Sequence, residues 1–127
     1  MNSKIAVGKI GESLAADYLQ NCGHQIYERN YRTRFGEVDL VTKQVDRLVF
    51  VEVKTRRSER YGLPQAAVTP KKQQQISAVA AHYLQVNQLF DQPCRFDVVA
   101  IRLNWQNRLI DLQHIENAFL YVAATES

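Results

Sequence analysis

The sequence predicts one α/β domain over residues 1–127, with a mixed central sheet flanked by helices. The chain has the length of a single domain that can bury its own core. Hydrophobic residues make up 46% and charged residues 23%, a balance typical of folded proteins in water. Segments with helical spacing alternate with β-rich segments in the order α-β-β-β-α-β-β-α, which favours a mixed sheet.

The first half of the chain predicts a helix followed by three strands. Residues 3–21 carry apolar side chains at helical spacing, and Gly23 follows just past their end. Residues 24–32, with tyrosines among polar neighbours, favour a first strand. Residues 36–42 and 47–55 are rich in β-formers, and the polar KQVD between them predicts a hairpin.

The second half begins with a loop over residues 58–70 that leads into another helix. Thr69 is a suitable N-cap, and Pro70 fits the first helical position, where its missing N–H is not needed. This helix is expected to run toward Asn87. The remaining predicted elements are strands over 95–103 and 108–113 and a short closing helix over 114–121.

Several classes of protein are disfavoured. No segment approaches the roughly 20 apolar residues that cross a bilayer, and the polar opening MNSKIAVGKIGES differs from a signal peptide. We therefore expect a cytoplasmic location. Cys22 and Cys94 lack metal-ligand or redox spacing and are interpreted as reduced structural thiols. His24, His82 and His114 also lack ligand spacing and are interpreted as structural or exposed.

The net charge of +3 alone says little about partners, but its distribution is uneven. Nine of the sixteen basic residues lie between Arg29 and Arg60, whereas Arg108 is the only one from Asn104 onward. A basic region of this kind could contact phosphates. From charge alone, a solvated charged face is the simpler interpretation.

The segment LVFVEVKTRR, residues 48–57, carries the chemistry. Side chains alternate along a strand, so Glu52 and Lys54 share one face with Leu48 and Phe50. The charges therefore lie near the carboxyl end of an otherwise apolar strand, where ligand sites in α/β sheets tend to occur.

Acidic residues of the preceding strand face the same region. In a hairpin that turns at residues 44–46, Glu52 lies opposite either Glu37 or Asp39 and diagonal to the other, with Cβ atoms about 5 Å apart. Crowded carboxylates must bind a proton or a cation. Lys54 supplies one positive charge, and Mg²⁺ or Mn²⁺ would balance the rest. The alternative is a screened pair on the solvent face of an edge strand.

Basic residues flank both strands, which favours a phosphate-bearing ligand. They are Arg32, Arg34, Arg56, Arg57 and Arg60. Lys71, near the start of the second helix, is a further candidate phosphate contact, with an ordinary surface lysine as the alternative. Asp97 is either another acid near the sheet or a structural hydrogen-bonding residue.

These motifs resemble a known family. GEVDL followed by EVK, with twelve residues between Asp39 and Glu52, resembles the PD-(D/E)xK pattern of metal-dependent nucleases. The segments GKIGESLAADYL, NYRTRFGEVDLV, LVFVEVKTRR, VTPKK and RFDVVAI are similar to the uncharacterised YraN-like family, whose members resemble archaeal Holliday-junction resolvases. The resemblance implies a restriction-endonuclease-like core, α-β-β-β-α-β-β, in a single Holliday-junction-resolvase-like domain over residues 1–127. Val38 stands where the pattern has proline.

The resemblance also implies roles for individual residues. Asp39 and Glu52 would bind the metal, with the backbone carbonyl of Val53 as a further ligand. Lys54 would position or deprotonate the attacking water. Glu12 matches an acidic residue on the first helix of such resolvases, and the alternative is a solvated helix glutamate.

The function expected on these grounds is metal-dependent hydrolysis of DNA phosphodiester bonds, with branched or single-stranded DNA as candidate substrates. The alternative is a nucleic-acid-binding protein of the same fold that cleaves weakly or not at all. A third interpretation, an interaction module, draws only on the loop around residues 61–64. By analogy with resolvases, a homodimer is the expected assembly, although no segment identifies its interface.

Overall fold

The computed structural model describes residues 3–58 and 68–123. The loop residues 59–67, with Arg60 and the segment 61–64, lie outside the described residues. The described elements are α1 (Ser3–Asn21), β1 (Gln25–Thr33), β2 (Gly36–Gln44), β3 (Arg47–Arg57), α2 (Pro70–Val86), β4 (Cys94–Leu103) and β5 (Leu109–Phe119).

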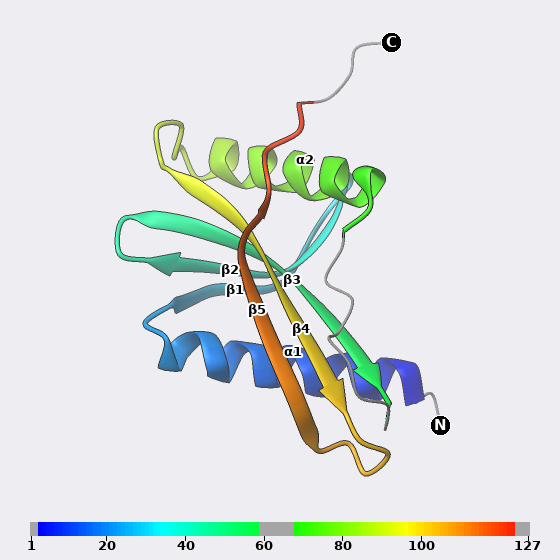
Figure 1. Ribbon diagram of the computed structural model, residues 1–127. Helices are drawn as coiled ribbons and strands as arrows, with labels where there is room; N and C mark the ends of the chain where they lie inside the picture. Colours follow the sequence, from blue (N-terminus) through cyan, green and yellow to red (C-terminus); the bar gives the residue numbers. More distant parts are fainter. Residues whose placement is uncertain (1–2, 59–67, 124–127) are drawn as a thin grey trace.

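The strands form one mixed sheet in the order β1-β2-β3-β4-β5. Only β3 and β4 pair in parallel, and the other three neighbouring pairs are antiparallel. A parallel pair needs a long crossover, and α2 lies on this connection. The mixed sheet flanked by helices that the sequence predicts is therefore confirmed (Figure 1).

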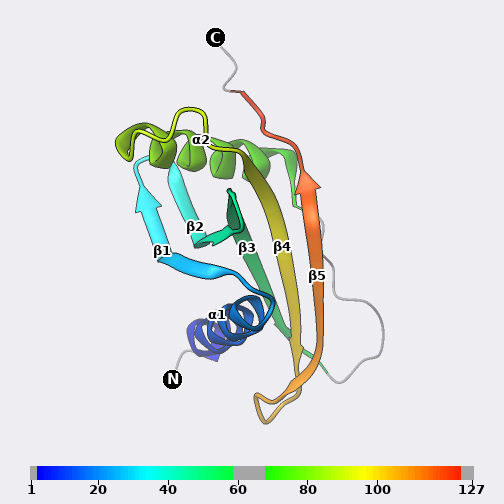
Figure 2. The ribbon, with the colours of Figure 1, turned by 90° about the vertical axis from the view of Figure 1, so that its left-hand side faces the viewer.

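Each helix covers one face of the sheet, so the core has two parts (Figure 2). On the α1 side, Ala16 and Leu19 pack with Val49 and Val51 of β3. On the α2 side, Ile76 and Val79 belong to a buried cluster that also contains Phe50 and Phe96. Neighbouring residues of β3 thus point to opposite faces, as strand geometry requires.

Local signals place the helix ends where the sequence predicts them. The Thr69 hydroxyl accepts a hydrogen bond from the N–H of Lys72 at 3.2 Å, and Pro70 begins α2. Gly23, with φ of +93°, follows the last turn of α1, where a left-handed conformation suits glycine.

The closing helix predicted over 114–121 is wrong. Strand β5 continues to Phe119, which pairs with Phe96 and stacks on its ring at 4.9 Å. A bulge lies between the pairs Val98–Ile115 and Phe96–Phe119, and Asn117 within it has φ of +53°. The bulge spaces Ile115 and Phe119 four residues apart, which is also a helical spacing, so the sequence pattern is ambiguous here.

Two further findings concern the cysteines and the described helices. Cys22 and Cys94 are free and exposed, so neither belongs to the core. Among the described helices, none is both long enough and apolar enough to cross a membrane.

Candidate functional site

Asp39 and Glu52 lie side by side where β2 and β3 separate. The last pair of the β2–β3 ladder is Leu40 with Val51, so Asp39 and Glu52 come next along their strands. Asp39 Oδ2 accepts a hydrogen bond from the N–H of Val53 at 2.7 Å. Beyond this point β2 and β3 diverge (Figure 1). We call the region between the start of β2, residues 36–39, and the end of β3, residues 52–57, the fork. The hairpin register therefore brings the two carboxyl groups together.

A third carboxyl group reaches this place from α1. Glu12 is half-buried and lies one turn after Gly8, where a Cβ atom would meet nothing within 4 Å. The side-chain amide of Asn30, oriented with its nitrogen toward the carboxyl groups, donates to Glu12 Oε2 at 3.1 Å and to Glu37 Oε1 at 3.2 Å. We call Glu12, Asp39 and Glu52 the acidic cluster.

The acidic cluster is electrostatically strained. Burial raises the pKa of Asp39, and the adjacent Glu52 carboxyl raises it further, to about 7. The Val53 N–H acts in the opposite direction. Burial and then the charge of Asp39 also raise the pKa of Glu12. A bound cation would remove this unfavourable interaction by favouring the ionised forms.

Two lysines accompany the acidic cluster. Lys54 is half-buried, two residues after Glu52 on β3, and so points to the same face of the strand. Lys72, in the first turn of α2, places its Nζ 3.5 Å from Glu52 Oε2. Lys72 is not among the site residues that the sequence predicts, whereas its neighbour Lys71, a predicted phosphate contact, is exposed. The N-cap at Thr69 is a sequence signal that could point to Lys72, because it fixes where α2 begins and therefore which residues of the first turn face the sheet.

Glu37 has a different environment from the one that the sequence suggests. Its Oε2 accepts hydrogen bonds from Arg32 Nε at 3.3 Å and from Arg32 Nη2 at 3.0 Å, on an exposed part of β1 and β2. The carboxyl groups that affect the pKa of Asp39 are those of Glu52 and Glu12. The third member of the acidic cluster is thus supplied by the helix and not by Glu37.

The other predicted phosphate contacts lie around the fork. Arg34 is exposed and stacks over Phe35 at 4.9 Å. Arg56 is exposed near the end of β3, and Arg57 lies over the ring of Trp105 at 5.2 Å. Because β2 and β3 are antiparallel, the start of β2 and the end of β3 belong to the same end of the sheet.

The chemistry of the cluster bears on whether a metal would fit. Within residues 3–58 and 68–123, no three His, Cys, Asp or Glu side chains form a group arranged to hold a metal ion. Mg²⁺, however, commonly takes only one or two carboxylates and completes its shell with water and phosphate oxygens. Asp39 and Glu52 meet this smaller requirement, since they are adjacent and their mutual repulsion would fall when a cation binds.

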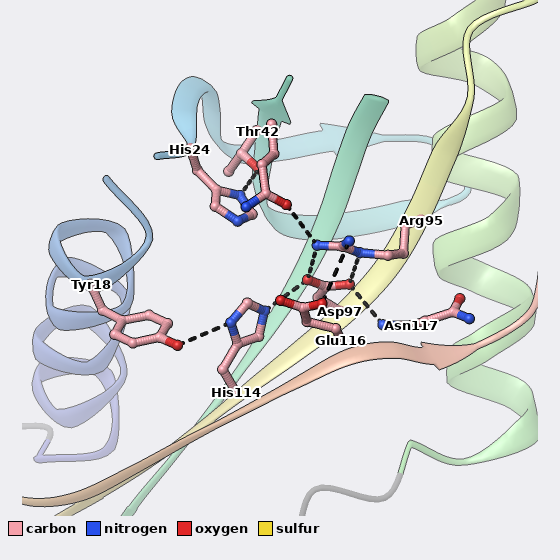
Figure 3. A network of polar contacts seen from close by, with 9 residues as sticks. Tyr18, His24, Thr42, Arg95, Asp97, His114, Glu116 and Asn117 are labelled. Carbon is pink, nitrogen blue, oxygen red and sulfur yellow. Dashed lines mark hydrogen bonds and ion pairs between the residues drawn. The ribbon is translucent and has the colours of Figure 1, made fainter. Parts of the chain in front are cut away.

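A second polar network lies on the α1 side of the sheet and centres on Asp97 (Figure 3). Arg95 donates to both Asp97 oxygens, at 2.8 and 3.0 Å, and the N–H of Asn117 donates to Oδ1 at 3.0 Å. His114 Nε2 lies 2.7 Å from Asp97 Oδ2, and His114 Nδ1 lies 3.2 Å from the Tyr18 hydroxyl. Asp97 is fully buried, so these bonds replace those that water would make.

The network contains two of the three histidines and agrees with their interpretation as structural residues. His24 and His114 are far apart in sequence, yet their ring centroids are 6.1 Å apart. His24 is buried and bonds to the Thr42 hydroxyl at 2.8 Å. Burial lowers its pKa, and His114 lowers it further. Sequence spacing cannot reveal such a cluster, because its members come from α1, β2, β4, β5 and the turn between α1 and β1.

Comparison with known proteins agrees with the motifs. The model of the uncharacterised protein family UPF0102 matches residues 11–101. A UPF0102 protein of Syntrophus aciditrophicus is 49% identical over 119 residues, which cover 94% of this chain and 92% of the relative. A UPF0102 protein of Trichlorobacter lovleyi is 52% identical over 117 residues, 90% of each chain.

A more distant relative extends the match. The UPF0102 protein of Caldicellulosiruptor saccharolyticus is 40% identical over 117 residues, which cover 92% of this chain and 99% of the relative. The matched residues 11–101 include every member of the acidic cluster, Lys54 and Lys72. The YraN-like resemblance is thus confirmed, and the chain belongs to the uncharacterised protein family UPF0102.

Proposed function

We propose that this protein is a metal-dependent nuclease with a restriction-endonuclease-like core, which hydrolyses phosphodiester bonds in DNA. The observation that carries the proposal is the placement of Asp39 between Glu52 and Glu12, with a pKa raised to about 7. Such a cluster is unfavourable without a cation, and perturbed carboxyl groups of this kind concentrate at functional sites.

The proposed roles are those that the resemblance implies, applied to the side chains of the acidic cluster and Lys54. Asp39 and Glu52 would hold Mg²⁺ or Mn²⁺, with the backbone carbonyl of Val53 as a further ligand. When bound, the metal would supply positive charge at the scissile phosphate and lower the pKa of the attacking water. Lys54 orients that water, and its charge offsets the negative charge that develops on the phosphate oxygens.

The other residues assist this chemistry. Glu12 completes the acidic cluster from the helix side and accepts a hydrogen bond from Asn30, which fixes its position. Lys72 holds Glu52 through a contact of 3.5 Å, so we assign it a positioning role. Arg32, Arg34, Arg56, Arg57 and Lys71 form the proposed phosphate contacts around the fork.

The test is a cleavage assay on duplex, single-stranded and branched DNA with Mg²⁺, Mn²⁺ or EDTA. The wild type is compared with Asp39→Asn, Glu52→Gln and Lys54→Met. Asp46→Asn is the matched control, because Asp46 is exposed at the turn that joins β2 to β3. We expect cleavage that needs metal, falls at least 100-fold in the three site variants and persists in the control.

A second readout is independent of activity. Isothermal titration calorimetry with Mn²⁺ should detect binding to the wild type and to Asp46→Asn, and no binding to Asp39→Asn. Cleavage that survives Asp39→Asn and Glu52→Gln would show that a contaminant is responsible and would refute the proposal.

A second candidate function is nucleic-acid binding with weak or no cleavage. It is favoured by the exposed side chains of Arg34 and Arg56, because contacts of arginine with phosphates need no metal. In that case none of the DNA forms is cut with either metal, while binding persists in EDTA and weakens steeply with salt.

A further inference from the structure

A pocket opens beside the acidic cluster on the α1 side of the sheet. Its volume is about 560 Å³, which falls in the range of roughly 300–1,000 Å³ that is usual for small-molecule sites. Glu12 and Val53 belong both to the pocket wall and to the surroundings of Asp39. The pocket therefore shares two residues with the surroundings of Asp39.

An aromatic ring forms the far wall of the pocket. Trp105 lies in the loop between β4 and β5, and 57% of its surface is exposed. The loop has a defined turn, because Asn104 Oδ1 accepts from the N–H groups of Gln106 at 2.9 Å and Arg108 at 3.0 Å. An exposed indole held by a structured turn is a suitable surface for a flat ring to stack on.

The charges of the wall favour an anionic ligand. Lys4, Arg56 and Arg57 all line the pocket, and among the lining residues that the structure describes Glu12 alone is acidic. Arg57 covers part of the Trp105 ring at 5.2 Å, and its Nη1 donates to Asn107 Oδ1 at 3.1 Å. An aromatic ring combined with fixed cations is the combination that binds nucleotide bases together with their phosphates.

We propose that this pocket binds one unpaired nucleotide of a single-stranded segment. Its base stacks on Trp105, its phosphate contacts Arg56 and Arg57, and the adjoining phosphodiester bond reaches the acidic cluster. This inference rests on the proposed function and specifies its substrate. A continuous duplex would fit poorly, because its base faces are already stacked on each other.

Trp105 is the only tryptophan in the chain, so its fluorescence reports directly on the pocket. The experiment titrates the wild type in EDTA, where cleavage cannot occur, with a 12-nucleotide oligothymidylate and with a duplex of the same length. We expect saturable quenching by the single strand and at least tenfold weaker binding of the duplex.

Variants then test the role of the ring by anisotropy of a labelled oligonucleotide. Stacking on an aromatic side chain is worth about 1–3 kcal/mol, so Trp105→Ala should weaken binding about 5- to 140-fold. Trp105→Phe should retain part of the affinity. Phe90→Ala is the matched control, because Phe90 is an exposed aromatic residue in the loop between α2 and β4, and binding should not change.

The outcomes separate this inference from the proposed function. Binding that depends on Trp105, without any cleavage when metal is added, would support the pocket and refute the nuclease. Metal-dependent cleavage with equal quenching by single strand and duplex, and no effect of Trp105→Ala, would support the nuclease and overturn the pocket. An oligoribonucleotide that binds equally well would support the stacking site and show that it does not distinguish the two sugars.

Discussion

Asp39 is the residue whose environment departs most from that of an ordinary side chain. Its pKa lies near 7 in the folded protein, mainly because of burial and then because of Glu52, against an ordinary value of 3.8. The folded state therefore holds a proton that the unfolded chain releases at lower pH. The resulting destabilisation is absent below about pH 4, grows as the pH rises and is complete above about pH 7.

Asp39→Asn should therefore stabilise the metal-free protein at alkaline pH. Asparagine cannot ionise, and its side-chain oxygen can still accept the hydrogen bond from Val53. We expect the free energy of unfolding in EDTA to rise by roughly 1–3 kcal/mol at pH 8 and by less at pH 5. Urea denaturation at both pH values measures the effect, with Asp46→Asn as the control. An equal effect at the two pH values would contradict this account.

Asp97 has the opposite relation to its surroundings. Burial alone would raise its pKa, but hydrogen bonds from His114, Arg95 and the Asn117 N–H lower it by more. A lowered pKa means that the ionised group stabilises the fold above its ordinary pKa, and that this stabilisation is lost as the pH falls below that value. Asp97 is thus a structural anion, whereas Asp39 is a destabilising one.

Asp97→Ala should destabilise the protein strongly. It leaves the Arg95 side chain, which is only 11% exposed, without its main partner. Removing one member of a buried ion pair costs about 3–5 kcal/mol. Glu116→Ala is the control, because Glu116 is 59% exposed and lies 3.8 Å from Arg95, and we expect less than about 1 kcal/mol. Thermal unfolding of both variants at pH 7 is the measurement. Similar losses of stability in the two variants would mean that Asp97 is not the centre of the network.

At the scale of elements, the close approach of α1 to β3 positions Glu12. A Cβ atom on Gly11 would stand 1.8 Å from Thr55 Oγ1 and 2.7 Å from Thr55 Cβ, so only glycine fits there. Gly8, one turn earlier, has open space around the same position. The contact between Gly11 and Thr55 therefore sets the distance between the helix and the strand, and it does so next to the acidic cluster.

Two glycine substitutions on the same helix should have opposite effects. Gly8→Ala should stabilise the protein by up to about 1 kcal/mol, because alanine favours a helix and meets no obstacle. Gly11→Ala gains the same propensity but must push α1 away from Thr55, and we expect a net loss of about 1–3 kcal/mol. Urea denaturation of both variants is the measurement. If Gly11→Ala were as stable as Gly8→Ala, the close contact would not limit the packing of α1.

Elements with strong local signals could be predicted from the sequence, and the exception shows why. The Thr69–Pro70 start of α2 and the glycine after α1 act on the adjacent backbone, so their effect does not depend on distant parts of the chain. The end of β5 depends on pairing with β4 and on a bulge at Asn117. A bulge changes the side-chain period, and no local pattern separates it from a helical turn.

For the whole molecule, the same distinction applies to the candidate site. Asp39 and Glu52 could be placed together because one hairpin register joins them. Lys72 reaches Glu52 through the packing of α2, and Tyr18 meets His114 across 96 residues of sequence. Such contacts depend on how helices lie on the sheet, which composition and spacing do not determine.

The two ends of β3 lead to a prediction about the charge of the molecule as a whole. Arg47 begins the strand and Arg57 ends it, so about 30 Å separates them. If nucleic acid binds at the fork, only the arginines at the Arg57 end of β3 should replace counterions on its phosphates. The slope of log K against log salt is negative, and each lost phosphate contact reduces its magnitude by about 0.7 for a single strand.

The double variant Arg56→Gln/Arg57→Gln should therefore reduce the magnitude of that slope by about 1.4 and weaken binding most at low salt. Arg47→Gln, an exposed arginine at the opposite end of β3, should leave the slope unchanged. Anisotropy titrations of a labelled oligothymidylate between 50 and 300 mM salt, in EDTA, provide the measurement. Equal losses in the two proteins would mean that binding follows net charge, and would place the nucleic acid elsewhere than the fork.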